Sequence, residues 1–152
     1  MTTPPAPVTL TELKLTDEMK TAVNGALLNR TPMVFAYVDA DGQPSLSFRG
    51  TTQAFSDDQL AVWVRNPEGG LLAALAGNNR FSLLYRNAET RTTLQFKGQG
   101  HMDDTEAVRQ TVYDNAPESE QAADKERKGR VLIIDLDSVE GRIPGFLVKM
   151  RR

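Results

Sequence analysis

The sequence predicts a mainly β domain with additional helices, arranged as a six-stranded antiparallel barrel flanked by those helices. Short apolar or alternating segments are joined by hairpin-like connections, and helices occur between only some of them. This order lacks the regular strand–helix alternation of a parallel sheet. The 152 residues, 39% of them hydrophobic, suffice for one domain with its own core. Prolines predict an extended arm over 1–15, so the domain spans 16–152.

The first elements are a helix and a hairpin. Thr16 or Asp17 can cap a helix whose apolar residues recur at three- and four-residue spacing. Thr31-Pro32 ends that helix, and a strand is expected over 33–39. The DADG sequence that follows is typical of a hairpin turn.

The segment 43–55 alternates with a period of two, which predicts a strand. Leu46 and Phe48 point to one side. The opposite side carries Ser45, Ser47, Arg49 and Thr51.

The remaining elements follow from apolar runs and helix-ending glycines. Strands are expected at 60–65, 81–87, 91–102 and 131–142. Helices are expected at 69–77, 104–115 and 118–129.

Composition excludes several chemistries. The chain has no cysteine, which excludes disulfides, thiolate nucleophiles and cysteine-bound metals, and its single histidine cannot form an all-histidine metal site in one subunit. A net charge of −2 disfavours nucleic-acid binding, and no apolar run is long enough to span a membrane. The first ten residues do not resemble an export signal, so a cytoplasmic location is expected.

One segment could bind an anion. Arg65 and Asn66 end a predicted strand, and the backbone N–H groups of Gly69, Gly70 and Leu71 lie at the start of a short helix. Such donors, together with the helix dipole, favour phosphate. The alternative is a surface arginine followed by an ordinary turn.

No residue is assigned a catalytic role from the pattern alone. The GQG sequence at 98–100 indicates either a strand bulge or a close approach by a ligand or partner. His101 and Tyr85 are the candidates for proton transfer. The acidic residues at 103–106 are better explained by helix capping than by a metal site.

The order and spacing of MVFAYVDADGQPSLSFRG, LAVWVRNPEGGLLAALAGNNRFSLLYRN and LQFKGQGHMDD resemble the pyridoxamine 5′-phosphate oxidase-like split-barrel flavoproteins. The likeness covers about 30–142. It implies a split β-barrel and a homodimer with FMN at the subunit interface. The other cofactors to consider are a deazaflavin, FAD or haem, or none. The C-terminal substrate residues of the true vitamin B6 oxidases have no counterpart here, so vitamin B6 oxidation is not expected.

The resemblance also implies cofactor-binding residues. They are Ser47, Arg49, Thr51, Trp63, Val64, Arg65, Asn66, Gly69, Gly70 and Leu71. Many FMN-binding relatives have a lysine near the position of Gly70 or Leu71, and this chain has none. Either Arg65 or Arg49 could replace its charge.

Because a flavin supplies the redox chemistry itself, a chain without cysteine can still be an oxidoreductase. The sequence therefore predicts a flavin-dependent oxidoreductase acting on an unknown small molecule. The alternative is a non-catalytic dimer that binds a flavin or another ligand.

Overall fold

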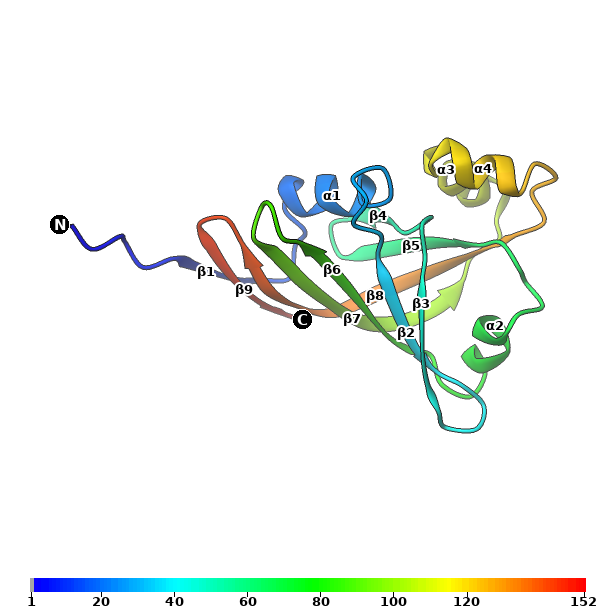
Figure 1. The fold of residues 1–152 in the computed structure, drawn as a ribbon. Helices are drawn as coiled ribbons and strands as arrows, with labels where there is room; N and C mark the ends of the chain where they lie inside the picture. The colour runs from blue at the N-terminus through cyan, green and yellow to red at the C-terminus, as the bar shows by residue number, and fades with distance from the viewer. Residues whose placement is uncertain (1) are drawn as a thin grey trace.

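The computed structural model describes residues 2–152, which form one nine-stranded sheet with four helices (Figure 1). The strands are β1 (Val8–Glu12), β2 (Val34–Val38), β3 (Pro44–Phe48), β4 (Gln53–Ser56), β5 (Gln59–Val64), β6 (Arg80–Asn87), β7 (Thr92–Met102), β8 (Arg130–Ile143) and β9 (Phe146–Arg151). The helices are α1 (Asp17–Asn24), α2 (Gly70–Leu75), α3 (Glu106–Asn115) and α4 (Glu118–Ala123).

The sheet is organised around the long strand β8. The strand order in the sheet is β1-β9-β8-β7-β6-β2-β3. Strand β5 also pairs with β8, and β4 pairs with β5. Along one edge of β8 lies β7, and along the other edge β5 pairs with residues 130–135 and β9 with residues 138–143. The sheet does not close on itself, and every pair is antiparallel except β1–β9. The predicted antiparallel split barrel flanked by helices is confirmed.

The strand count differs from the predicted six. The predicted strand over 43–55 is two strands, because the chain turns where the amide of Thr52 donates to the carbonyl of Arg49 (3.2 Å). Strand β9 follows a turn at Pro144-Gly145 in which Gly145 has φ +81°. Strand β1 lies within the segment predicted as an extended arm, and residues 2–7 precede it without regular structure (Figure 1).

Two helices are shorter than predicted. Helix α2 has six residues, and α4 ends at Ala123, so residues 124–129 form a loop. Helix α1 begins as expected, because the hydroxyl of Thr16 accepts a hydrogen bond from the amide of Met19 (3.2 Å).

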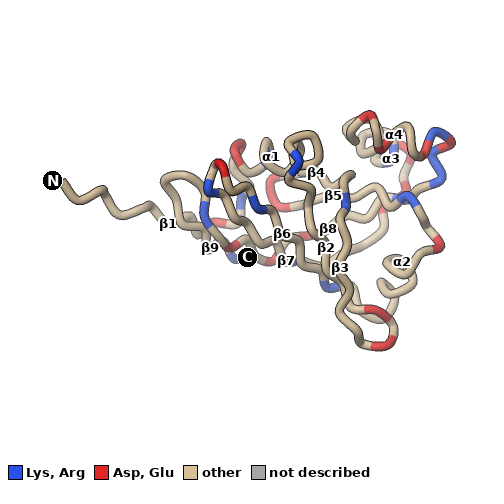
Figure 2. The backbone as a smooth tube through the Cα atoms, in the orientation of Figure 1, with Lys and Arg blue, Asp and Glu red and all other residues tan. Residues whose placement is uncertain are grey.

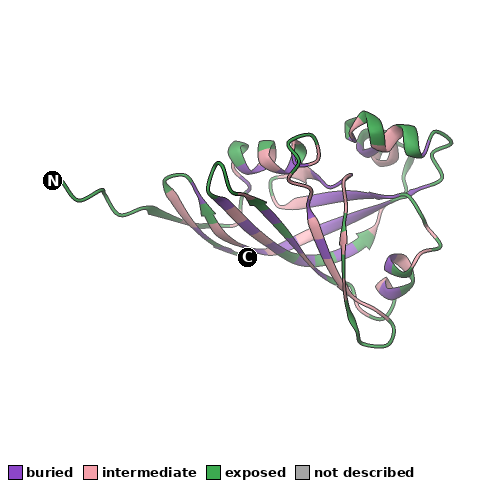
Figure 3. Cartoon of the chain, in the orientation of Figure 1, coloured by how far each residue is buried: buried purple, intermediate pink, exposed green. Residues whose placement is uncertain are grey.

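The interior consists of two apolar clusters. Figure 3 shows the buried residues in purple, most of them on the strands. The larger lies inside the curved sheet and includes Phe35 and Phe96, both fully buried. The smaller lies between helix α3 and strands β5 and β8, and is formed by Ala61, Trp63, Val112, Tyr113, Val131 and Ile133. Because successive side chains of a strand point to opposite faces, β5 contributes to both clusters and is buried on each side.

Among residues 2–152, no helix has the length and apolar character that crossing a membrane requires.

Candidate functional site

Arg49 follows β3 and is half-buried, with the polar side of the strand facing inward. Its Nε donates a hydrogen bond to the Ser47 hydroxyl (3.1 Å), and its guanidinium lies 5.9 Å from the ring centre of Phe35. The backbone is fixed as well, because the amide of Arg49 donates to the carbonyl of Met33 (3.0 Å). The side chain of Arg49 is therefore held in one orientation.

Arg65 lies close enough to Arg49 for the two positive charges to interact. Burial lowers the pKa of Arg49, Tyr37 acts in the opposite direction, and the charge of Arg65 lowers it further. Within residues 2–152, neither guanidinium forms an ion pair with a carboxylate. Two neighbouring cations without a counter-charge create a local field that favours an anion.

The loop between Arg65 and α2 places its groups near Tyr37. Asn66 closes a turn by accepting a hydrogen bond from the amide of Glu68 (3.1 Å). A Cβ on Gly70 would lie 3.2 Å from the Tyr37 hydroxyl, so glycine allows Tyr37 to approach the backbone closely. Gly69 and Leu71, the predicted cofactor residues on either side of Gly70, differ in their surroundings. Gly69 precedes the first residue of α2, and Leu71 packs into the larger apolar cluster.

Other predicted residues have structural partners. The Thr51 hydroxyl donates to the carbonyl of Trp63 (2.8 Å) and accepts from its amide (3.1 Å), which ties the segment before β4 to β5. Val64 is buried in the larger cluster. Trp63 is only 3% exposed and lies in the smaller cluster, on the side of β5 opposite to Val64. The structure thus brings Ser47, Arg49 and Arg65 together, and it directs the indole of Trp63 elsewhere.

Tyr37 was not among the predicted site residues. It interacts electrostatically with Arg49 and approaches Gly70, so it connects the cation pair to α2. The alternation of Phe35 and Tyr37 along β2 placed both on the inward face, and that pattern was the available signal.

The two candidates for proton transfer, His101 and Tyr85, lie in different surroundings. The His101 Nδ1 on β7 lies 2.8 Å from the carboxylate of Asp135 on β8, and that carboxylate accepts a hydrogen bond from the side-chain amide of Gln59 (2.8 Å). Tyr85 is 3% exposed within the core. The packing of the strands explains both glycines of the GQG sequence. The register of β7 shifts at Gly98, and a Cβ on Gly100 would collide with the Phe81 ring.

The chain matches solved structures by shape. No protein-family model matches it, and no curated protein matches it in sequence. A proposed pyridoxamine 5′-phosphate oxidase of Lactobacillus delbrueckii is similar with a TM-score of 0.64 and 18% identity, over 88% of this chain and 99% of that one. General stress protein 26 of Bacillus anthracis also has a TM-score of 0.64, with 12% identity over 89% and 99% of the two chains.

HupZ of Group A Streptococcus is similar with a TM-score of 0.63 and 19% identity, covering 86% of this chain and 96% of that one. Because the sequence identities are below 20%, these similarities establish a shared fold and nothing beyond it. The predicted resemblance to the pyridoxamine 5′-phosphate oxidase-like split barrels is therefore confirmed as a shared fold.

Proposed function

We propose that the chain is a flavin-binding member of the pyridoxamine 5′-phosphate oxidase-like family, and that it is an oxidoreductase acting on a small molecule. FMN is the proposed cofactor, with its phosphate bound by Arg49 and Arg65. The observation that carries this proposal is the pair of guanidiniums without a carboxylate partner, on a fold shared with proteins of that family.

The residues present fit a phosphate monoester. Guanidinium groups bind phosphate through charge-assisted hydrogen bonds, and two of them balance its double charge. Arg49 is held by Ser47 and Phe35 before any ligand arrives, so little side-chain entropy is lost on binding. This pair supplies the positive charge that no lysine at Gly70 or Leu71 provides.

In this proposal, residues of the chain bind the cofactor's phosphate and orient the groups that hold it. Arg49 and Arg65 hold the phosphate end, while Ser47 keeps the Arg49 guanidinium directed toward it. The hydroxyl of Tyr37, next to Gly70, is a further hydrogen-bonding group at the same place. When bound, the flavin itself supplies the acceptance and donation of hydride.

We further propose a homodimer with the cofactor at the subunit interface. Strand β3 presents its apolar side chains outward, with Leu46 74% and Phe48 71% exposed. Phe48 pairs with Val34 of β2, which pairs with Leu84 of β6, so the apolar side chains form a row across three strands. We call Val34, Ala36, Leu46, Phe48 and Leu84 the outer patch. Exposed contiguous apolar surface of this kind is typical of interfaces, and a second copy is its proposed occupant.

Titration of the purified protein with FMN, followed by flavin fluorescence, tests the proposed phosphate site. Replacing Arg65 by Ala should weaken binding by about 1–3 kcal/mol, which is roughly a 5- to 150-fold higher Kd. Lys149→Ala is the matched control, since Lys149 is exposed on β9 and lies outside the site. Equal FMN affinity in Arg65→Ala and the unaltered protein would refute the assignment.

The same preparation separates an enzyme from a non-catalytic flavin-binding dimer. Steady-state reduction of bound FMN by a nicotinamide donor supports the oxidoreductase. Tight FMN binding without reduction by nicotinamides or other donors supports the alternative, for which the missing lysine is the specific observation.

A further inference from the structure

A hollow lies on the outer face of the sheet and shares Ala36 with the outer patch. Its cavity volume is about 430 Å³, and it is lined by strands β2, β3, β6, β7 and β8. One side is apolar and formed by Ala36, Val38 and Pro44, whereas the other carries Arg80 and Lys97. An apolar surface with a few polar groups converging on it is typical of small-molecule sites.

The register of the sheet explains this arrangement. Ala36 of β2 pairs with Ser82 of β6, which pairs with Lys97 of β7, so these three side chains stand in one row. Val38 pairs with Pro44 beside that row. The apolar and cationic walls therefore belong to rigid neighbouring strands rather than to loops, and the hollow is preformed.

The charges in the hollow select the ligand. Within residues 2–152, neither Arg80 nor Lys97 forms an ion pair with a carboxylate. One carboxylate, Asp137, also lines the hollow, and it accepts a hydrogen bond from Gln99 (3.4 Å). Two cations and one anion leave a net charge of +1, which suits a monoanion, while Asp137 would repel a second negative charge.

We propose that this hollow binds a small apolar monocarboxylate, with the carboxylate on Arg80 and Lys97 and the apolar body against Ala36, Val38 and Pro44. This site is separate from the proposed phosphate site. Tyr37 lines the hollow, but its hydroxyl lies near Gly70, and along β2 it alternates to the face opposite Ala36 and Val38.

Benzoate is the probe, because it combines one carboxylate with a flat apolar body. The full chain without flavin is titrated with benzoate and followed by amide NMR. We expect saturable shifts at Ser82, Lys97 and Gly98. Lys97→Gln and Arg80→Gln should each weaken benzoate binding about tenfold, whereas Lys149→Gln should leave it unchanged. All three side chains are exposed, so the fold tolerates the changes.

Two analogues test the charge argument. Benzamide has the same shape without the negative charge, and phenyl phosphate carries a second one. Both should bind more weakly than benzoate. Benzoate affinity that is equal in Lys97→Gln, in Arg80→Gln and in the unaltered protein, or shifts confined to other strands, would overturn the site.

The titration is independent of the cofactor. Benzoate binding together with failure to bind FMN would uphold the hollow and overturn the proposed function. FMN binding with no response to benzoate would overturn the hollow and leave the proposed function standing.

Discussion

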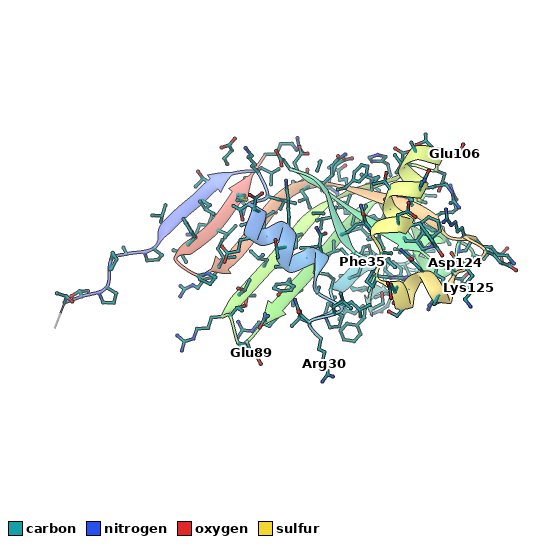
Figure 4. All side chains as sticks on the ribbon, turned by 90° about the horizontal axis from the view of Figure 1, so that it is seen from above. Arg30, Phe35, Glu89, Glu106, Asp124 and Lys125 are labelled. Atoms are coloured by element: carbon teal, nitrogen blue, oxygen red, sulfur yellow. The ribbon has the colours of Figure 1, made fainter. Side chains whose placement is uncertain are left out.

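Asp124 is a buried carboxylate that holds the loop after α4 in place (Figure 4). It accepts hydrogen bonds from the Trp63 indole (2.8 Å) and from the amides of Lys128 and Gly129 (2.9 Å each). Burial alone would raise the pKa of Asp124, but these hydrogen bonds and the charge of Arg109 outweigh it and hold the pKa below its ordinary value. One side chain thus ties the loop to strand β5.

Replacing Asp124 by Ala should destabilise the protein by about 1–3 kcal/mol, because it leaves buried donors without an acceptor. The folded-state pKa of Asp124 lies below its ordinary value of 3.8, which is taken for the unfolded chain. Its contribution is therefore complete above that value and is lost as the pH falls through the folded-state pKa. Urea unfolding from pH 7 to pH 2 checks this, with the exposed Asp41→Asn as control. A destabilisation that stays the same down to pH 2 would contradict the assignment.

Strand β7 depends on two glycines at which other groups come close. A Cβ on Gly98 would lie 2.3 Å from the carbonyl of Asp135, and one on Gly100 would lie 2.3 Å from the Phe81 ring. The GQG sequence predicted either a bulge or a close approach by a ligand or partner; the structure shows an irregularity at Gly98, and the groups that come close to both glycines belong to β6 and β8. The partners could not be recognised, because they come from β6 and β8.

Gly100→Ala should cost about 1–3 kcal/mol in unfolding free energy, since Phe81 and Leu132 would have to move within a packed core. The urea midpoint measures this. Gly77→Ala is the control, because the nearest atom to its Cβ would be 3.9 Å away. A midpoint for Gly100→Ala equal to that of the control would show that the core yields freely at this position.

The sequence predicted best those helices and strands in which the apolar residues recur with one clear spacing. Strand β5 shows why the site was harder: it is buried on both faces, so alternation cannot tell which face adjoins a cofactor. The family resemblance implied Trp63 as a cofactor residue, whereas its indole packs against α3. Strands β1 and β9 were missed because VTLTE lies among prolines and FLVKMR is short, yet the Pro144-Gly145 turn signalled the latter.

At the scale of the whole molecule, charge is distributed unevenly over the surface (Figure 2). Acidic residues occupy the turn between β2 and β3, where Asp39 and Asp41 lie. The outer patch presents apolar side chains from three strands, with Arg80 and Lys97 beside it.

Phe48→Lys should convert a dimer into a monomer, because a charge would be buried at the interface. Light scattering after size-exclusion chromatography measures the mass. Leu28→Lys is the matched control, since Leu28 is 77% exposed but lies after α1, outside the outer patch. A monomeric unaltered protein, or a dimer that survives Phe48→Lys, would refute the proposed interface.

The parallel pairing of β1 with β9 joins segments from nearly opposite ends of the chain (Figure 1). Closing so long a loop costs more conformational entropy than forming any adjacent hairpin. During folding, local hairpins such as β6–β7 should therefore form early, and β1 should add to the sheet late. Until it does, β9 is an open edge, and the time spent in that state sets the period during which two folding chains can pair wrongly.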